Sequence, residues 1–274
     1  MGIRQRFDVY SIPIKHPDLT FSEETRPFRP GLTNTPFKPA GSGPFPALVV
    51  MPTCAAHTYS LHTFDWAQQA LSRGYAVLVV ETLKSRGVSE NCAEPRAVPL
   101  SRIVKDAFDA ANYLRHQPFV DPTRICLIGF SQGATAALGA ASSQHAPSPD
   151  SVRFRAIVSL YPTCFLANMT RSEVPYPVDV SHLADKIEAP TLVLMGDLDT
   201  GAGPDMGGCK SVLEDRKAKG EPVDYEIYHA THIWDWRELP SYNWGPDDGT
   251  YDSEITRRSV EDAFAFFDKQ LKAT

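Results

Sequence analysis

The sequence places a serine between two glycines, in the pentapeptide Gly129-Phe130-Ser131-Gln132-Gly133. A β-branched apolar stretch, residues 124–130, precedes this serine, and a stretch of small residues, 132–141, follows it. The pattern G-x-S-x-G between a strand and a helix is typical of a strained turn that exposes a serine hydroxyl above a sheet. We therefore predict that Ser131 is a nucleophile; the alternative is a Gly/Ser loop with no chemical role.

A hydroxyl nucleophile needs an acid–base partner downstream, and in this pattern the acid comes first in the chain. The apolar stretch 191–196 is followed by two acids, Asp197 and Asp199. We favour Asp199 because it lies deeper in the loop, while Asp197 stands at the last turn of the strand. A calcium loop of the EF-hand type is excluded because Gly201 and Gly208 occupy two of its ligand positions.

The base should follow one more strand, and two histidines are placed there. His229 falls within the alternating stretch 223–230 and has the parity of a packed side chain, whereas His232 lies just beyond it. We therefore predict His232 as the base. Two backbone N–H groups would stabilise an oxyanion: that of Gln132, and that of Cys54 or Ala55 in the loop after the first buried strand.

Buried strands and amphipathic helices alternate along the chain, and this order must bring those residues to one place. Near-continuous apolar stretches predict strands buried on both faces, hence a parallel sheet; they are residues 47–53, 75–82, 124–130, 154–161 and 191–196. Apolar stripes predict helices over 100–114 and 260–271. We expect one α/β domain over residues 1–274, with leading strands and loops in 1–46 and at most a small lid in 163–189.

Composition excludes several classes of protein. The 274 residues carry 27 Lys+Arg and 33 Asp+Glu, a formal net charge of −6, without the basic cluster that nucleic-acid binding requires. Twenty-three prolines and 17 glycines are too many for a coiled coil or a helical bundle. No apolar stretch reaches the ~18 residues of a membrane-spanning helix, and the first residues lack the pattern of a signal peptide.

The five cysteines are widely spaced and contain no C-x-x-C pair. This pattern predicts reduced thiols in a cytoplasmic protein, without a zinc site. The sequence also lacks H-E-x-x-H or a comparable cluster, which argues against a metal-dependent hydrolase. We expect no cofactor.

Four stretches resemble the α/β-hydrolases, and more narrowly the dienelactone-hydrolase-related branch. They are PAGSGPFPALVVMPTCAA, LSRGYAVLVVETLKSRG, DAANYLRHQPFVDPTRICLIGFSQG and LMGDLDTGAGP with YHATH. The resemblance implies an α/β-hydrolase fold, with a mostly parallel central sheet and helices on both faces. Dienelactone hydrolases proper use a cysteine nucleophile; Ser131 at that position implies a serine esterase instead. Relatives often carry Asp where Glu81 stands, and a different loop where Cys54 and Ala55 stand.

Three further residues are candidates for substrate contact. Arg86 follows the second strand and is predicted to reach a substrate carboxylate or, equally, to pair with an acid such as Glu81. Trp234 and Trp236 follow the predicted base, and they either wall an apolar pocket or fasten their own loop.

The sequence thus predicts hydrolysis of a small carboxylic ester or lactone through an acyl-enzyme on Ser131. A peptidase or thioesterase with the same residues is an alternative, since these residues do not select the leaving group. A ligand-binding module without catalysis is the alternative from another class.

Overall fold

The computed structural model describes residues 18–22, 28–29, 32–55, 61–92, 97–164, 186–200, 208–237 and 249–273. Seven strands in this part of the chain form one sheet, in the order β1-β3-β2-β4-β5-β6-β7. β1 runs antiparallel to β3, and every other neighbouring pair is parallel. The predicted fold class, an α/β fold with a mostly parallel sheet, is therefore confirmed.

β2 to β7 overlap the strands predicted from the sequence, with β3 and β5 shorter than predicted, and the short β1 lies in the leading segment 1–46. Their bounds are Pro36–Phe37 (β1), Phe45–Met51 (β2), Ala76–Val79 (β3), Val120–Phe130 (β4), Ile157–Leu160 (β5), Thr191–Gly196 (β6) and Val223–Tyr228 (β7). β6 has the predicted bounds. β5 is shorter than predicted because its pairing with β6 begins only at Ile157, although Phe154 is already buried in the core.

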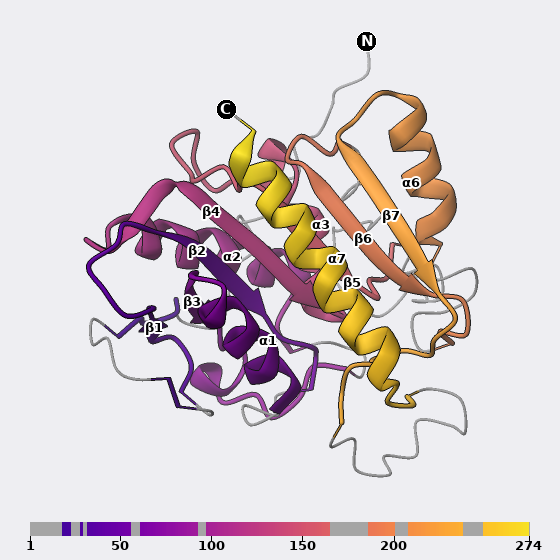
Figure 1. The fold of residues 1–274 in the computed structure, drawn as a ribbon, viewed down its shortest axis with the longest axis horizontal. Helices are drawn as coiled ribbons and strands as arrows, with labels where there is room; N and C mark the ends of the chain where they lie inside the picture. Colours follow the sequence, from indigo (N-terminus) through magenta and orange to yellow (C-terminus); the bar gives the residue numbers. More distant parts are fainter. Residues whose placement is uncertain are drawn as a thin grey trace.

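Helices cover both faces of the sheet (Figure 1). α1 (Leu61–Ser72) and α7 (Ser253–Lys272) pack on one face, where their aromatic side chains enter one hydrophobic cluster. α2 (Leu100–Arg115), α3 (Gln132–Ala140) and α6 (Cys209–Ala218) pack on the other. Two short 3₁₀ turns, η1 (Lys84–Arg86) and η2 (Ser143–His145), lie in connections.

The two predicted helices are present, and local sequence explains their ends. α2 begins after Pro99 and ends at Arg115, three residues before Pro118. α7 begins earlier than the predicted stripe because the Asp252 carboxylate accepts hydrogen bonds from the N–H groups of Glu254 and Ile255 at the helix start. Within the described residues, no helix combines the length and apolar character needed to cross a bilayer.

Because β2 to β7 run parallel, their carboxyl ends share one edge of the sheet. The loops that leave this edge carry Cys54, Ser131, Asp199 and His232. The segment in which a small lid was expected, 163–189, lies mostly outside the described residues. The sheet thus converges the predicted residues on one edge, as a parallel sheet should.

Two disulfide bonds contradict the prediction of reduced thiols. Cys54 pairs with Cys92, and Cys164 pairs with Cys209. Each bond joins the loops that follow two neighbouring strands, β2 with β3 and β5 with β6, so the partners are close in space although 38 and 45 residues apart in sequence. Sequence spacing alone does not reveal such pairs, because strand order decides which loops meet.

Candidate active site

Ser131 occupies a sharp turn between β4 and α3. Its backbone has φ +52° and ψ −115°, a conformation that residues with a side chain rarely adopt. The Ser131 N–H donates to the carbonyl of Leu160 at 3.0 Å, which ties the turn to the end of β5. Strain of this kind persists only where the surroundings hold it, and it is common at sites of chemistry.

The two glycines of the pentapeptide are required by close backbone contacts. A Cβ atom on Gly129 would lie 2.2 Å from the Gly133 carbonyl oxygen. A Cβ atom on Gly133 would lie 2.3 Å from the carbonyl oxygen of Met51 and 2.4 Å from that of Pro52. The end of β2 therefore packs directly against the first turn of α3, beside Ser131.

Ser131, His232 and Asp199 form one hydrogen-bonded chain. His232 Nε2 lies 3.1 Å from Ser131 Oγ, and His232 Nδ1 lies 2.7 Å from Asp199 Oδ2. Asp199 and His232 are both buried, and they leave the carboxyl ends of the neighbouring strands β6 and β7. This geometry lets the imidazole accept the serine proton at Nε2 while the carboxylate holds the Nδ1–H.

The two alternatives considered from the sequence, Asp197 and His229, pair with each other instead. His229 Nδ1 lies 3.1 Å from both carboxylate oxygens of Asp197, and both side chains are exposed. The structure thus separates a buried Asp–His pair at Ser131 from an exposed Asp–His pair on the surface.

A second buried network packs against the His232 ring. The Tyr161 ring meets the imidazole edge-to-face, with centroids 4.9 Å apart. The Tyr161 hydroxyl donates to Asp235 Oδ1 at 2.8 Å, and the Trp66 Nε1–H donates to Asp235 Oδ2 at 2.7 Å. Burial raises the pKa of Tyr161 well above its ordinary value, and Asp235 adds to this effect. Tyr161 therefore acts as a neutral donor that fixes the wall behind the imidazole.

A further buried histidine, His62, lies at the start of α1. Its ring stacks on Trp236 and meets Phe130, the residue before Ser131, edge-to-face, with centroid distances of 5.0 and 5.2 Å. Burial lowers the pKa of His62, against the opposing effect of the Asp235 carboxylate. An uncharged His62 is consistent with its aromatic surroundings.

The predicted oxyanion donors lie on the elements expected of them. Gln132 is the first residue of α3, and Cys54 follows β2 in the segment that packs against Gly133. The N-terminus of a helix favours negative charge, which suits the position of Gln132. Cys54 is joined to Cys92 by a disulfide, so its side chain is not a competing nucleophile.

Arg86 does not reach into this site, and the expectation of substrate contact is corrected. Its guanidinium is fully buried and binds Asp106 through two hydrogen bonds, of 2.6 and 2.8 Å. It also donates to the Thr82 carbonyl at 2.5 Å. The predicted alternative, an ion pair, is the correct kind of role, but the partner is Asp106 on α2 and not Glu81.

The two tryptophans pack into the core beside the base. Trp234 is completely buried against Tyr161 and Tyr228, and its Nε1–H donates to Ser259 Oγ on α7 at 3.3 Å. It fastens the loop, which corrects the expectation of a pocket wall. Trp236 stacks on His62, and its contact with a substrate stays a prediction.

Sequence reasoning missed several residues that shape the site. Tyr161 and Asp235 each have one signal in the sequence. Tyr161 directly follows the buried strand β5, and Asp235 lies three residues after His232. Asn91 had none, because its partners are 7 and 41 residues away. Among the described residues, no group of three or more His, Cys, Asp or Glu side chains could hold a metal ion.

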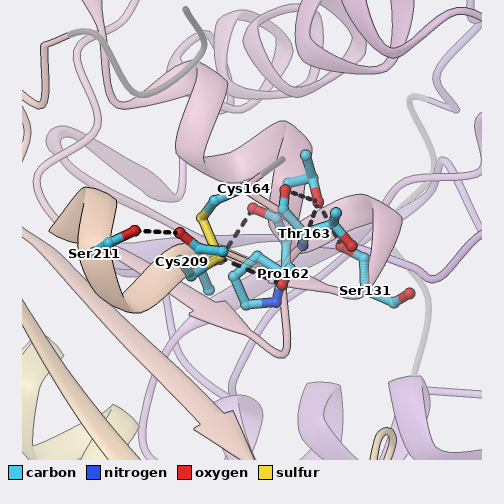
Figure 2. Close-up of a disulfide and its surroundings, with 10 residues drawn as sticks. Ser131, Pro162, Thr163, Cys164, Cys209 and Ser211 are labelled. Atoms are coloured by element: carbon cyan, nitrogen blue, oxygen red, sulfur yellow. Dashed lines mark hydrogen bonds between the residues drawn. A yellow bond between two sulfur atoms is a disulfide. The ribbon is translucent and has the colours of Figure 1, made fainter. Parts of the chain in front are cut away.

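A chain of short links connects Ser131 to the second disulfide (Figure 2). The Thr135 hydroxyl donates to the Ser131 carbonyl at 3.3 Å and accepts a hydrogen bond from the Thr163 N–H at 3.1 Å. Thr163 precedes Cys164, whose bond to Cys209 anchors it to the start of α6. The turn that carries Ser131 is thus braced from the β5 side.

The fold and this edge of the sheet define the chain as an α/β hydrolase. A family model described as the dienelactone hydrolase family matches residues 32–271, so the protein belongs to that family. This confirms the resemblance to the dienelactone-hydrolase-related branch, and it places the chain among the hydrolases.

Solved structures share this fold at low sequence identity. Esterase 2 of Thermogutta terrifontis with bound propionate has a TM-score of 0.62 and 15% identity, over 85% of this chain and 88% of that one. The same esterase has also been solved phosphorylated by paraoxon. A dienelactone hydrolase-like promiscuous phosphotriesterase from metagenomic libraries has a TM-score of 0.57 and 19% identity, covering 84% of this chain and 88% of that chain.

A curated relative matches a shorter stretch. Polyketide transferase claH of Penicillium crustosum is 34% identical over 102 residues, which are 37% of this chain and 30% of that protein. The chain therefore spans less than a third of the length of that relative.

Proposed function

We propose that the protein hydrolyses a small carboxylic ester or lactone through an acyl-enzyme on Ser131. The observation that carries the proposal is the hydrogen-bonded chain from Ser131 Oγ through His232 to Asp199, with distances of 3.1 and 2.7 Å. Membership of a family of hydrolases supports the reaction class.

In the first half of the proposed reaction, His232 Nε2 takes the Ser131 proton as Oγ attacks the substrate carbonyl carbon. The backbone N–H groups of Gln132 and Cys54 stabilise the resulting oxyanion. The C–O bond to the leaving alcohol then breaks, and the imidazolium returns the proton to that alcohol. Asp199 orients the ring and stabilises its positive charge.

In the second half, His232 deprotonates a water molecule that attacks the acyl carbon. The bond to Ser131 Oγ breaks, the proton returns to that oxygen, and the carboxylic acid leaves. No step needs a metal or an organic cofactor. The same three residues can act on thioester or peptide carbonyls. Assays with different substrates therefore identify the leaving group.

The direct test is intact-mass analysis after treatment with a fluorophosphonate, together with a chain-length series of p-nitrophenyl esters and a lactone. We expect one adduct per chain at Ser131 and turnover of at least one ester. Both should disappear in Ser131→Ala, since this variant lacks the nucleophile. A folded wild-type protein that gives no adduct and no turnover would contradict the proposal and favour a binding module.

Acyl transfer to an alcohol in place of water is the second candidate function. The observation in its favour is the 102-residue match to a polyketide transferase. An acyl-enzyme on Ser131 would serve both reactions, because only the attacking nucleophile differs. Adding increasing concentrations of a primary alcohol to the ester assay, and measuring new ester against free acid, distinguishes the two.

A further inference from the structure

Two loops meet beside the first turn of α3, one after β2 and one after β3. The Asn91 N–H donates to the Cys54 carbonyl at 2.8 Å, and Ala55 and Glu90 form an antiparallel β-bridge. The Cys54–Cys92 disulfide adds a covalent link between the same two loops. Cys54 is thus held to residues 91 and 92 by a backbone hydrogen bond, which belongs to the bridge, and by the disulfide.

The Asn91 side chain connects these two loops to α3. It is almost completely buried, and its Nδ2 donates to Gln132 Oε1 at 3.2 Å. In return, the Gln132 Nε2 donates to the Asn91 carbonyl at 3.4 Å. The Asn91 amide also pairs with both backbone groups of Val98, at 2.9 Å each, which fixes its own orientation.

Cys54 and Gln132 are the two residues whose backbone N–H groups would hold the oxyanion. They lie on different elements, so their separation depends on what joins those elements. Stabilisation of an oxyanion requires donors that are already in place before charge develops. Asn91 is bonded to both residues, to Cys54 through its main chain and to Gln132 through its side chain.

We propose that Asn91, with the Cys54–Cys92 disulfide, is a positioning residue that sets the distance between the two oxyanion donors. The inference rests on the proposed function and deepens it. Asn91 touches no reacting atom; it acts by holding the loop after β2 against the start of α3. Its loss should weaken binding of the transition state while leaving ground-state binding of the ester largely unchanged.

The first test compares Asn91→Ala with Asn34→Ala. The Asn34 side chain donates to the Glu81 carbonyl at 3.4 Å and accepts from the Glu81 N–H at 2.9 Å. Asn91 pairs with the backbone of Val98 in the same way. Asn34 has φ +54°, so its replacement should cost at least as much stability. We expect kcat to fall about 10- to 100-fold in Asn91→Ala, with KM within about threefold, and both to stay near wild type in Asn34→Ala.

A second variant covers the case in which Asn91→Ala fails to fold. Gln132→Met keeps the backbone N–H and the side-chain length but removes both bonds to Asn91. It leaves the pairing of Asn91 with Val98 intact, so the protein should fold. We expect a fall in kcat of about tenfold at unchanged KM, and little further loss when both substitutions are combined.

The outcomes separate this inference from the proposed function. A wild-type protein that forms no Ser131 adduct and has no turnover overturns both. A normal adduct on wild type, with kcat retained in Asn91→Ala or in Gln132→Met, overturns the positioning role alone. An equal fall in kcat in Asn34→Ala also overturns it, since the effect would then follow stability.

Discussion

At the scale of the residue, the chain contains two Asp–His pairs that differ in burial and in position. Asp199 and His232 are buried at Ser131, whereas Asp197 and His229 are exposed on the surface. Asp197 and Asp199 follow β6, and His229 and His232 follow β7. The two pairs share no residue, so each pair can be replaced by substitution while the other is kept. They provide a matched comparison within one molecule.

We predict that Asp199→Asn lowers kcat by about 10⁴-fold, because the amide no longer holds the imidazole in the required tautomer. His232→Gln should lower it at least as much. Asp197→Asn and His229→Gln should leave kcat within about twofold of wild type. Steady-state rates on one p-nitrophenyl ester measure this, and a large loss in either surface variant would refute the assignment.

Arg86 provides a prediction that separates a structural role from a substrate role. Arg86→Met removes both hydrogen bonds from Arg86 to the buried Asp106 carboxylate, which keeps only the ion pair with Arg102 Nε at 3.3 Å. Breaking a buried ion pair by removing one partner costs about 3–5 kcal/mol. We therefore expect Arg86→Met to lower the free energy of unfolding by about that amount. The KM ratio between an acidic and a neutral ester should not change.

Urea unfolding and the two KM values supply the measurements. Arg257→Met is the control for loss of an arginine, because its partner Glu261 is exposed and surface pairs contribute little. A rise in KM for the acidic ester alone would contradict the structural role and indicate that Arg86 contacts the substrate.

The residues of the site that can be predicted from the sequence are those fixed by their order along the chain. Ser131, Asp199 and His232 follow from the order of motif, strand and loop, and the structure brings all three together. For Arg86 and Trp234 the sequence leaves substrate contact and a structural role open, since both residues follow strands that end at the same edge as the strand before Ser131. Whether a side chain turns inward to Asp106 or Ser259 is decided by packing partners far away in sequence.

At the scale of the element, the backbones of β2 and α3 come close together beside Ser131. Gly133 allows this approach because a Cβ atom there would overlap the carbonyl oxygens of Met51 and Pro52. These are backbone atoms, so they cannot move aside without shifting the strand that leads to Cys54. The glycine thus affects both stability and the position of the loop after β2.

We predict that Gly133→Ala lowers the free energy of unfolding by about 1–3 kcal/mol, as overpacking does. It should also lower kcat by at least tenfold, since displacement by about 1 Å is enough to misplace a catalytic group. Gly220→Ala is the control, because Gly220 has open space around it and a positive φ, far from Ser131 in the sheet order. It should lose stability and retain kcat.

Thermal melts and kcat on one ester measure both effects. Wild-type kcat in Gly133→Ala would show that the β2–α3 contact does not control the site.

The elements themselves were largely predictable. A continuous apolar stretch predicts a strand that is covered on both faces, and β6 is fully buried and has the predicted bounds. α6 was not predicted, because only Cys209 and Leu213 are buried and the rest of its surface is polar. No apolar stripe predicts α1, since several of its buried residues are polar, among them His62 and Thr63.

At the scale of the whole molecule, both disulfides lie at the edge of the sheet that carries Ser131. One braces the β2–β3 side and the other the β5–β6 side. Disulfides persist in oxidising compartments and are rare in the cytosol. The basis of the predicted cytoplasmic location, reduced thiols, is therefore lost.

We predict that Cys54→Ser/Cys92→Ser and Cys164→Ser/Cys209→Ser each lower the free energy of unfolding by about 2–4 kcal/mol. Loops of 38 and 45 residues would regain chain entropy in the unfolded state. Urea unfolding with and without dithiothreitol provides the measurement, and the reductant should change nothing further once both bonds are removed. Alkylation of five thiols in the unreduced, denatured protein would contradict both bonds.

The fifth cysteine, Cys126, lies in the middle of β4 and keeps its thiol. Burial raises the pKa of this thiol to about 12, so the folded chain holds it unreactive. A thiol reagent would therefore modify the unreduced protein only when the central strand opens to solvent. At a reagent concentration at which modification outpaces reclosing, the rate of modification equals the unfolding rate, so this thiol is a built-in probe of the kinetic stability of the protein.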